Sequence, residues 1–214
     1  MSELSGEALK QAATTSMIEG GDIRSRVRDL TLNALRHRRL NAEEVRQVMR
    51  ALTEGVSLGA EQSKHDMSET LAQAMAGLDD ALLKAVQASH LALQQLTTQG
   101  KEFGENDLKA ALANLKKVEE DFLATINEVA EKGGIRAKSE LKSLAEHARR
   151  AGTDTGRQVA ETLREFSQRS TGIAREGQAT GMSVARELSS RFTMLASGIL
   201  AGMADALHDA AKKK

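Results

Sequence analysis

The chain has 214 residues, with 30 basic and 30 acidic side chains, no Pro, Cys, Trp or Tyr, and four Phe. The lack of cysteine excludes disulfides and cysteine nucleophiles. The balanced charge argues against a general nucleic-acid binder, which needs a basic excess to release counterions. Because compact cores normally draw on aromatic bulk, this composition predicts a thin, elongated, all-α protein built on Ala, Leu, Met and Val.

Residues 1–40 are expected to form two short helices. Gly20-Gly21 is expected to end the first helix, and Asp22 to cap the second. The second helix carries arginines on all sides, which we interpret as a solvated surface rather than a membrane or nucleic-acid contact. They are Arg24, Arg26, Arg28, Arg36, Arg38 and Arg39.

An apolar pattern with a period of eleven residues runs through residues 41–98. Its columns, which begin at Val45, Met49 and Leu52, hold no charged residue. Eleven residues make about three helical turns, so the pattern predicts one straight stripe on a helix roughly 85 Å long. Gly55 and Gly59 each cost about 1 kcal/mol relative to Ala, so a bend near them is the alternative.

Residues 106–151 change to a heptad pattern. Leu108, Leu115, Phe122 and Val129 are seven residues apart, which is the signal of a left-handed coiled coil. The preceding loop is expected at Gly100–Asn106. Whether Gly133-Gly134 acts as a hinge or lies within a continuous helix is left open.

The eleven-residue period returns over residues 141–207, which include most of the last arm (153–211), with uncharged columns that begin at Leu141, Leu144 and Ala148. The sequence Gly152–Gly156 is a second candidate interruption, where Thr153 or Thr155 is expected to cap a new helix if the chain breaks there. These patterns together predict an elongated antiparallel bundle or coiled coil of three long amphipathic arms within residues 41–211. The turns are expected near 100–105 and 152–156. A nearly continuous rod that pairs with other subunits is the competing geometry.

Charge is segregated along the chain. Residues 41–100 are net acidic and residues 135–191 are net basic. We therefore expect the arm 41–98 to be the partner of the last arm.

Two sets of residues in the last arm are candidate contact sites. Small residues on one helix face permit close helix pairing, which is expected at Gly177, Gly181, Gly198 and Gly202. A surface or partner contact is expected at Phe166, Leu188, Phe192, Met194, Leu195, Ile199, Leu200 and Met203.

The uncharged run Phe192–Ala204 is about 20 Å long as a helix, too short to cross a ~30 Å hydrocarbon layer. It is long enough to lie on an apolar or lipid surface, with Lys212–Lys214 reaching headgroups. The alternative is that it forms the packed end of a bundle.

Catalytic and metal-binding patterns are weak. Glu61, His65 and Glu69 would share one helix face, but their spacing and the lack of a second copy do not match di-metal bundles. We therefore expect no enzyme activity, no metal and no cofactor. The N-terminus lacks a secretory signal and no apolar run is long enough to span a membrane, which favours the cytoplasm.

The Ala-, Gln- and Leu-rich sequence, with stretches such as residues 71–76 (Leu-Ala-Gln-Ala-Met-Ala) and a Lys-terminated tail, resembles phasins. Phasins are helical bacterial proteins that coat polyhydroxyalkanoate storage granules. The resemblance covers most of residues 41–211 in composition and periodicity, features that also resemble apolipoproteins. It implies a homo-oligomeric coat on a granule, lipid or polymer surface. A self-associating structural bundle without a lipid role is the alternative.

Overall fold

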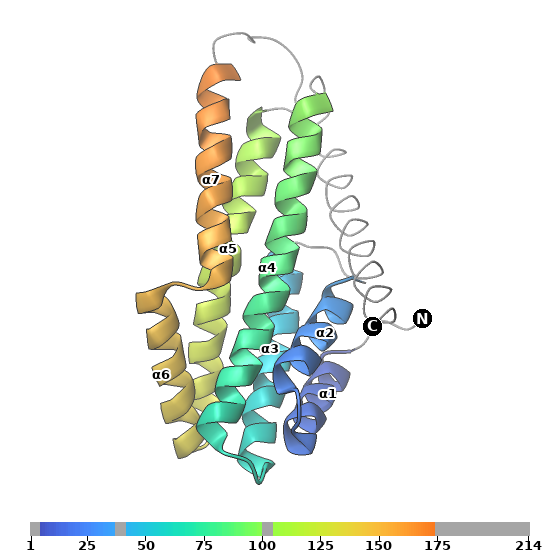
Figure 1. Ribbon diagram of the computed structural model, residues 1–214, viewed down its shortest axis with the longest axis vertical. Coiled ribbons are helices and arrows are strands. Elements are labelled where there is room, and N and C mark those ends of the chain that lie inside the picture. Colours follow the sequence, from blue (N-terminus) through green and yellow to red (C-terminus); the bar gives the residue numbers. More distant parts are fainter. Residues whose placement is uncertain (1–4, 37–41, 100–104, 174–214) are drawn as a thin grey trace.

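The computed structural model describes residues 5–36, 42–99 and 105–173 of the chain (Figure 1). Every regular element within these ranges is an α-helix, which confirms the predicted all-α bundle. The helices are α1 (Gly6–Glu19), α2 (Ile23–Arg36), α3 (Ala42–Gln62), α4 (Met67–Gln99), α5 (Glu105–Lys132), α6 (Ile135–Ala151) and α7 (Asp154–Ile173).

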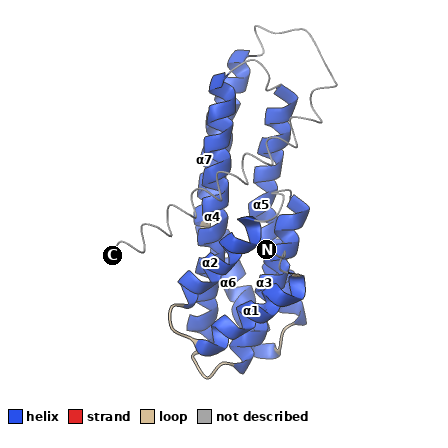
Figure 2. Ribbon diagram, turned by 90° about the vertical axis from the view of Figure 1, so that its right-hand side faces the viewer, coloured by secondary structure: helices blue, strands red, loops and turns tan. Residues whose placement is uncertain are grey.

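The helices form three α-hairpins that stand side by side with their turns at one end (Figure 1). The first hairpin is α1–α2, the second is α3–α4, and the third is α5 followed by α6 and α7. Helices α1, α3 and α5 make one layer and run toward the turns, whereas α2, α4 and α6–α7 make the other and run away from them (Figure 2). Packing is therefore antiparallel within each hairpin and parallel within each layer.

The three turns lie next to one another. A Cβ atom at Gly20, in the first turn, would come 2.4 Å from Nε2 of His65 in the second turn. The backbone N–H of Gly134, in the third turn, donates to Oε1 of Glu61 at the end of α3 over 2.6 Å. These contacts fix the in-register stacking of the hairpins.

The first turn forms as the sequence predicts. Gly20 and Gly21 have φ values of 69° and 77°, in the left-handed region that glycine tolerates best. Asp22 then accepts a hydrogen bond from the backbone N–H of Ser25 (3.1 Å), which caps α2. Hydrogen bonding to Ser25 lowers the pKa of the Asp22 carboxyl, as expected for a carboxylate at a helix N-terminus.

The main core lies between the two layers and extends through all three hairpins. Leu9 of α1 and Val27 of α2 belong to the same buried cluster as Leu52 and Leu82 of the second hairpin. Helices α1 and α2 therefore share one core with the second hairpin.

A second, smaller cluster lies farther from the turns, where α7 packs against α4 and α5. Its buried members are Val86, Leu93, Ala111, Leu115, Val159 and Phe166.

Three glycines let the first hairpin approach the second closely. A Cβ at Gly55 would come 2.2 Å from the carbonyl oxygen of Lys10, and one at Gly59 would come 2.7 Å from that of Thr14. Gly77 of α4 lies equally close to α2, with a Cβ position 2.4 Å from the carbonyl oxygen of Arg24. Helix α3 continues through Gly55 and Gly59 without interruption.

The prediction of one helix over residues 41–98 is wrong. The chain reverses at residues 63–66, between α3 and α4. Asp66 accepts a hydrogen bond from the backbone N–H of Glu69 (2.9 Å) and so caps α4. The eleven-residue columns nevertheless mark buried positions on both sides of this turn.

The other two interruptions differ from each other. Gly133-Gly134 ends α5, and α6 turns back along it, so the predicted arm 106–151 is two antiparallel helices. At Gly152, where φ is 79°, α6 gives way to α7, which continues in the same direction at a sideways offset (Figure 1). The predicted turn at 152–156 is therefore an offset rather than a reversal. The described part of the last arm ends at Ile173.

Candidate functional site

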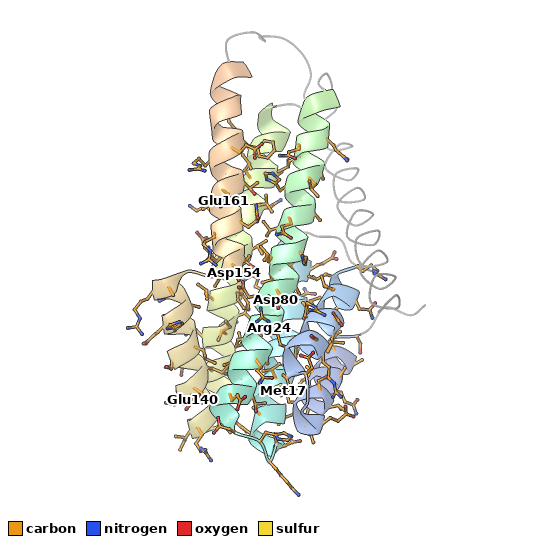
Figure 3. The ribbon with its side chains drawn as sticks, viewed as in Figure 1. Met17, Arg24, Asp80, Glu140, Asp154 and Glu161 are labelled. Carbon is orange, nitrogen blue, oxygen red and sulfur yellow. The ribbon has the colours of Figure 1, made fainter. Side chains whose placement is uncertain are left out.

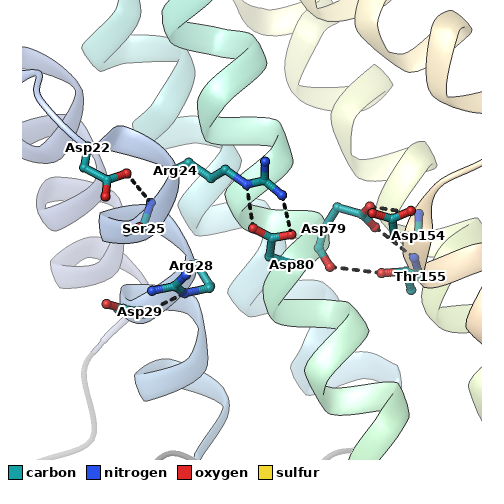
Figure 4. Close-up of polar contacts among 9 residues, drawn as sticks. All are labelled: Asp22, Arg24, Ser25, Arg28, Asp29, Asp79, Asp80, Asp154 and Thr155. Carbon is teal, nitrogen blue, oxygen red and sulfur yellow. Dashed lines mark hydrogen bonds and ion pairs between the residues drawn. The ribbon is translucent and has the colours of Figure 1, made fainter. Parts of the chain in front are cut away.

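The polar seam between α4 and α7 contains several polar side chains that lie inside the bundle, among them Asp79, His90 and Thr162. Two adjacent aspartates of α4, Asp79 and Asp80, point in different directions from its middle (Figure 4). Asp80 lies beside Arg24 of α2 (Figure 3) and forms a two-pronged ion pair with it at 2.7 and 2.8 Å (Figure 4). Asp79 faces the start of α7. This point of α4 therefore ties the first hairpin to the third.

Asp79 caps α7 from a neighbouring helix. Its carboxylate accepts hydrogen bonds from the backbone N–H groups of Asp154 (3.0 Å) and Thr155 (3.3 Å). The Thr155 hydroxyl donates to the Asp79 carbonyl oxygen over 3.1 Å. Burial raises the pKa of the Asp79 carboxyl, and the hydrogen bonds from Thr155 oppose that shift only in part.

Thr153 provides the second cap of α7. Its hydroxyl accepts from the Gly156 N–H (2.8 Å) and donates to Oε1 of Glu119 on α5 (3.0 Å). The sequence predicted that Thr153 or Thr155 would cap a helix here, and Thr153 does so.

A histidine lies farther along the same seam. His90 Nδ1 is 3.1 Å from the Thr162 hydroxyl and Nε2 is 3.4 Å from Oε2 of Glu165. The ring meets Phe166 edge-on, with centroids 5.6 Å apart. The Thr162 hydroxyl also donates to the Gln158 carbonyl oxygen over 2.8 Å.

The His90 group resembles a nucleophile–base–acid arrangement only in residue type. Thr162 is 0% exposed and its proton is directed to a backbone carbonyl, so its oxygen is not poised to attack a substrate. The geometry instead suits a polar clamp between α4 and α7.

A cavity of about 230 Å³ opens beside this seam, where α6 is offset from α7. Apolar side chains make most of its wall, and Asp79 and Asp154 lie at its polar end. The lining residues are Met75, Ala76, Asp79, Phe122, Ile126, Leu144, His147, Ala148, Ala151, Gly152, Thr153 and Asp154.

The structure separates the residues weighed as metal ligands. Glu61 ends α3, His65 lies in the turn and Glu69 begins α4, so they do not share one helix face. Glu61 instead accepts the hydrogen bond from Gly134. In the described ranges, no group of three or more His, Asp or Glu side chains is arranged to hold a metal ion.

Of the eight predicted surface-contact residues, only Phe166 lies among the residues that the structure describes. Phe166, expected in a surface contact, is 0% exposed and lies in the smaller core cluster, because α7 turns that face toward α4 and α5. The other seven predicted contacts, from Leu188 to Met203, lie outside the described residues. So do Gly177, Gly181, Gly198 and Gly202.

Close helix pairing through small residues does occur, but at Gly55, Gly59 and Gly77. The four-residue spacing of Gly55 and Gly59 was a signal for it in the sequence. Asp66 followed by Glu69 was a comparable signal for the missed turn. No local signal indicated that Asp79 would cap a helix 75 residues away.

No helix among the residues described here is both long and apolar enough to cross a membrane. The search of the curated proteins and the search of the solved structures each found no match. One family model, described as a family of unknown function (DUF6781), matches residues 1–209. Since this match covers almost the whole chain, the protein belongs to the DUF6781 family.

Proposed function

We propose that this protein is a non-catalytic, phasin-like attachment protein. In this proposal a folded helical body faces water, and the C-terminal segment binds an apolar surface such as a storage granule or a lipid layer.

Burial of the apolar stripes in the body carries the proposal. Leu71, Leu78 and Leu82 of α4 are each 0% exposed, although the sequence alone allowed them to lie on a lipid surface. Large hydrophobic side chains that are exposed in the described ranges are few and scattered over four helices. They are Ile18, Leu58, Leu91 and Ile135.

The described helices therefore expose little apolar area that could bind a granule or a lipid layer. Phe192–Ala204, an uncharged run followed by Lys212–Lys214, then has the composition best suited to that contact. Its apolar side chains would enter the surface layer, and the lysines would pair with anionic headgroups.

Co-sedimentation tests this proposal. The full chain is expected to pellet with anionic vesicles or with polyhydroxyalkanoate particles, and a chain ending at residue 191 is expected to stay in the supernatant. The substitution Ile199→Asp should weaken binding at least ~10-fold, since a charge at that position opposes insertion. Leu91→Asp, on the exposed side of α4, is the matched control and should bind as the unmodified chain does.

Binding that survives removal of residues 192–214, or that is lost equally in Leu91→Asp, would assign the contact to the body and reject the proposal. Failure of the full chain to bind either surface would also reject it.

Self-association is the second candidate. The 92% exposure of Ile135 and the 39% exposure of Leu58, both near the turns, favour a contact between copies of this chain. Long coiled-coil pairing, which the heptads of residues 108–129 predict, would be one form of it. Light scattering on the same samples distinguishes the two candidates, because self-association raises the molar mass without any vesicle.

A further inference from the structure

The cavity beside the α4–α7 seam results from the break between α6 and α7 at Gly152. Helix α6 ends at Ala151. The positive φ of Gly152 then shifts the chain sideways, so that the axis of α7 is displaced from that of α6. Side chains of α6 and α7 therefore cannot cover α4 continuously at this level. The space left open, about 230 Å³, has α4 and α5 as its floor.

The two ends of the cavity differ in chemistry. Met75, Phe122 and Ile126, which are 9%, 3% and 2% exposed, supply an apolar floor. The polar lining consists of Asp79 and Asp154, which meet at the start of α7 and form the polar end, together with Thr153 and His147. Asp154 is paired with Arg157, whereas Asp79 is held by backbone N–H groups.

The Asp79 carboxylate at the polar end is partly buried and is held by hydrogen bonds to backbone N–H groups. None of the ion pairs found in the described ranges joins a Lys or Arg to Asp79. Burial raises the pKa of its carboxyl, although hydrogen bonds from Thr155 and the charge of Arg157 oppose that shift. A partly desolvated carboxylate with no direct ion pair is stabilised by a positively charged partner that excludes water.

We propose that this cavity binds a small organic amine, with an alkyl or aryl group against Met75, Phe122 and Ile126 and an ammonium group at Asp79. A ring with a short aminoalkyl chain suits the size of the space. Carboxylate and phosphate ligands are disfavoured because the polar end is already anionic. A neutral alcohol fills the same apolar volume but supplies no charge.

Titration of the full chain with three probes of one shape tests this assignment. Benzylamine is expected to bind at one saturable site by calorimetry and to raise the melting temperature with concentration. Benzyl alcohol is expected to bind at least ~10-fold more weakly, and benzoate not to bind. Equal binding of all three probes, or no benzylamine binding at about 10 mM, would overturn the proposal.

A pair of matched substitutions locates the site. Ala151 lines the cavity and is exposed, so Ala151→Leu should fill the space without crowding the core and should abolish benzylamine binding. Ala160→Leu adds the same atoms on the exposed side of α7 and should leave binding unchanged. Binding that persists in Ala151→Leu, or is lost in both variants, would place the amine elsewhere.

The charge at the polar end is tested by Asp79→Asn. This change keeps a hydrogen-bond acceptor for the N-terminus of α7 but removes the charge. Amine binding should fall at least ~10-fold while alcohol binding stays the same, and circular dichroism should show retained helix. Unchanged amine affinity in a folded variant would refute the role of Asp79. If the variant unfolds, the Ala151 pair still decides the location.

Discussion

Gly55 is a residue at which α1 and α3 come close together. Its Cα faces the backbone of α1, and the atom nearest to an added Cβ is a carbonyl oxygen, which cannot rotate away. The sequence indicates only that glycine weakens an isolated helix. In the structure the same glycine removes the side chain that would hold the first hairpin off the second.

Gly55→Ala is therefore expected to destabilise the protein, although alanine favours helix by about 1 kcal/mol. The 2.2 Å approach to Lys10 O forces α1 to move, which typically costs about 1–3 kcal/mol. Chemical denaturation measures the change in the free energy of unfolding.

Gly6→Ala is the control for this substitution. Gly6 begins α1, and its nearest contact, Cβ of Ala51, would be at an ordinary 3.9 Å. This variant should be neutral or slightly stabilised. Equal effects of the two substitutions would show that helix propensity, not close packing, decides the outcome.

Residue-scale predictions succeeded where the interaction is local in sequence. Asp22 and Thr153 cap helices within three residues of themselves, so their chemistry could be inferred without the fold. Phe166 could not be assigned in this way, because an apolar residue on a stripe has the same pattern whether it contacts protein or a surface.

At the scale of the element, the turn between α3 and α4 shows why an apolar period alone predicted a single helix over residues 41–98. The turn contains neither glycine nor proline, so the usual breaking signals are absent. Apolar periodicity reports which side of each helix faces the core, and both helices face the same core. The eleven-residue apolar pattern therefore continues through the turn at residues 63–66, although the chain reverses direction there.

Asp66→Ala is expected to weaken this turn. Removing the side chain leaves the Glu69 N–H without its capping oxygen, which costs about 1 kcal/mol. Thermal unfolding followed by circular dichroism should show a lower melting temperature. Asp66→Asn retains a capping oxygen and should lose much less stability. A similar loss in both variants would mean that the charge of Asp66, rather than its cap, stabilises the start of α4.

The pairing of the acidic arm with the last arm was predicted from charge, and α4 does contact α7. The contacts have a different chemical basis. Asp79 binds backbone N–H groups, and His90 bridges Thr162 and Glu165. Net charge thus indicated a partner, but capping and polar side chains provide the register.

At the scale of the whole molecule, the main core depends on the central hairpin, because α3 and α4 contact both neighbouring hairpins. Leu82→Ala, at a 0% exposed position, should therefore destabilise the protein by about 2–5 kcal/mol. Leu91→Ala removes the same atoms from the same helix at a position that is 44% exposed, and should change stability by less than about 1 kcal/mol.

Chemical denaturation of both variants measures this difference. Comparable losses at Leu82 and Leu91 would contradict the assignment of the core to the space between the layers.

The sequence by itself determined the helical class, the caps at Asp22 and Thr153 and many of the buried positions of the described helices. These properties depend on composition, on residues a few positions apart and on the 3.6-residue period of the helix. Only the tertiary structure decided the stacking of three hairpins, the close approach at Gly55 and the capping of α7 by Asp79. Each of these depends on backbone and side-chain groups far apart in the chain, which no local pattern brings together.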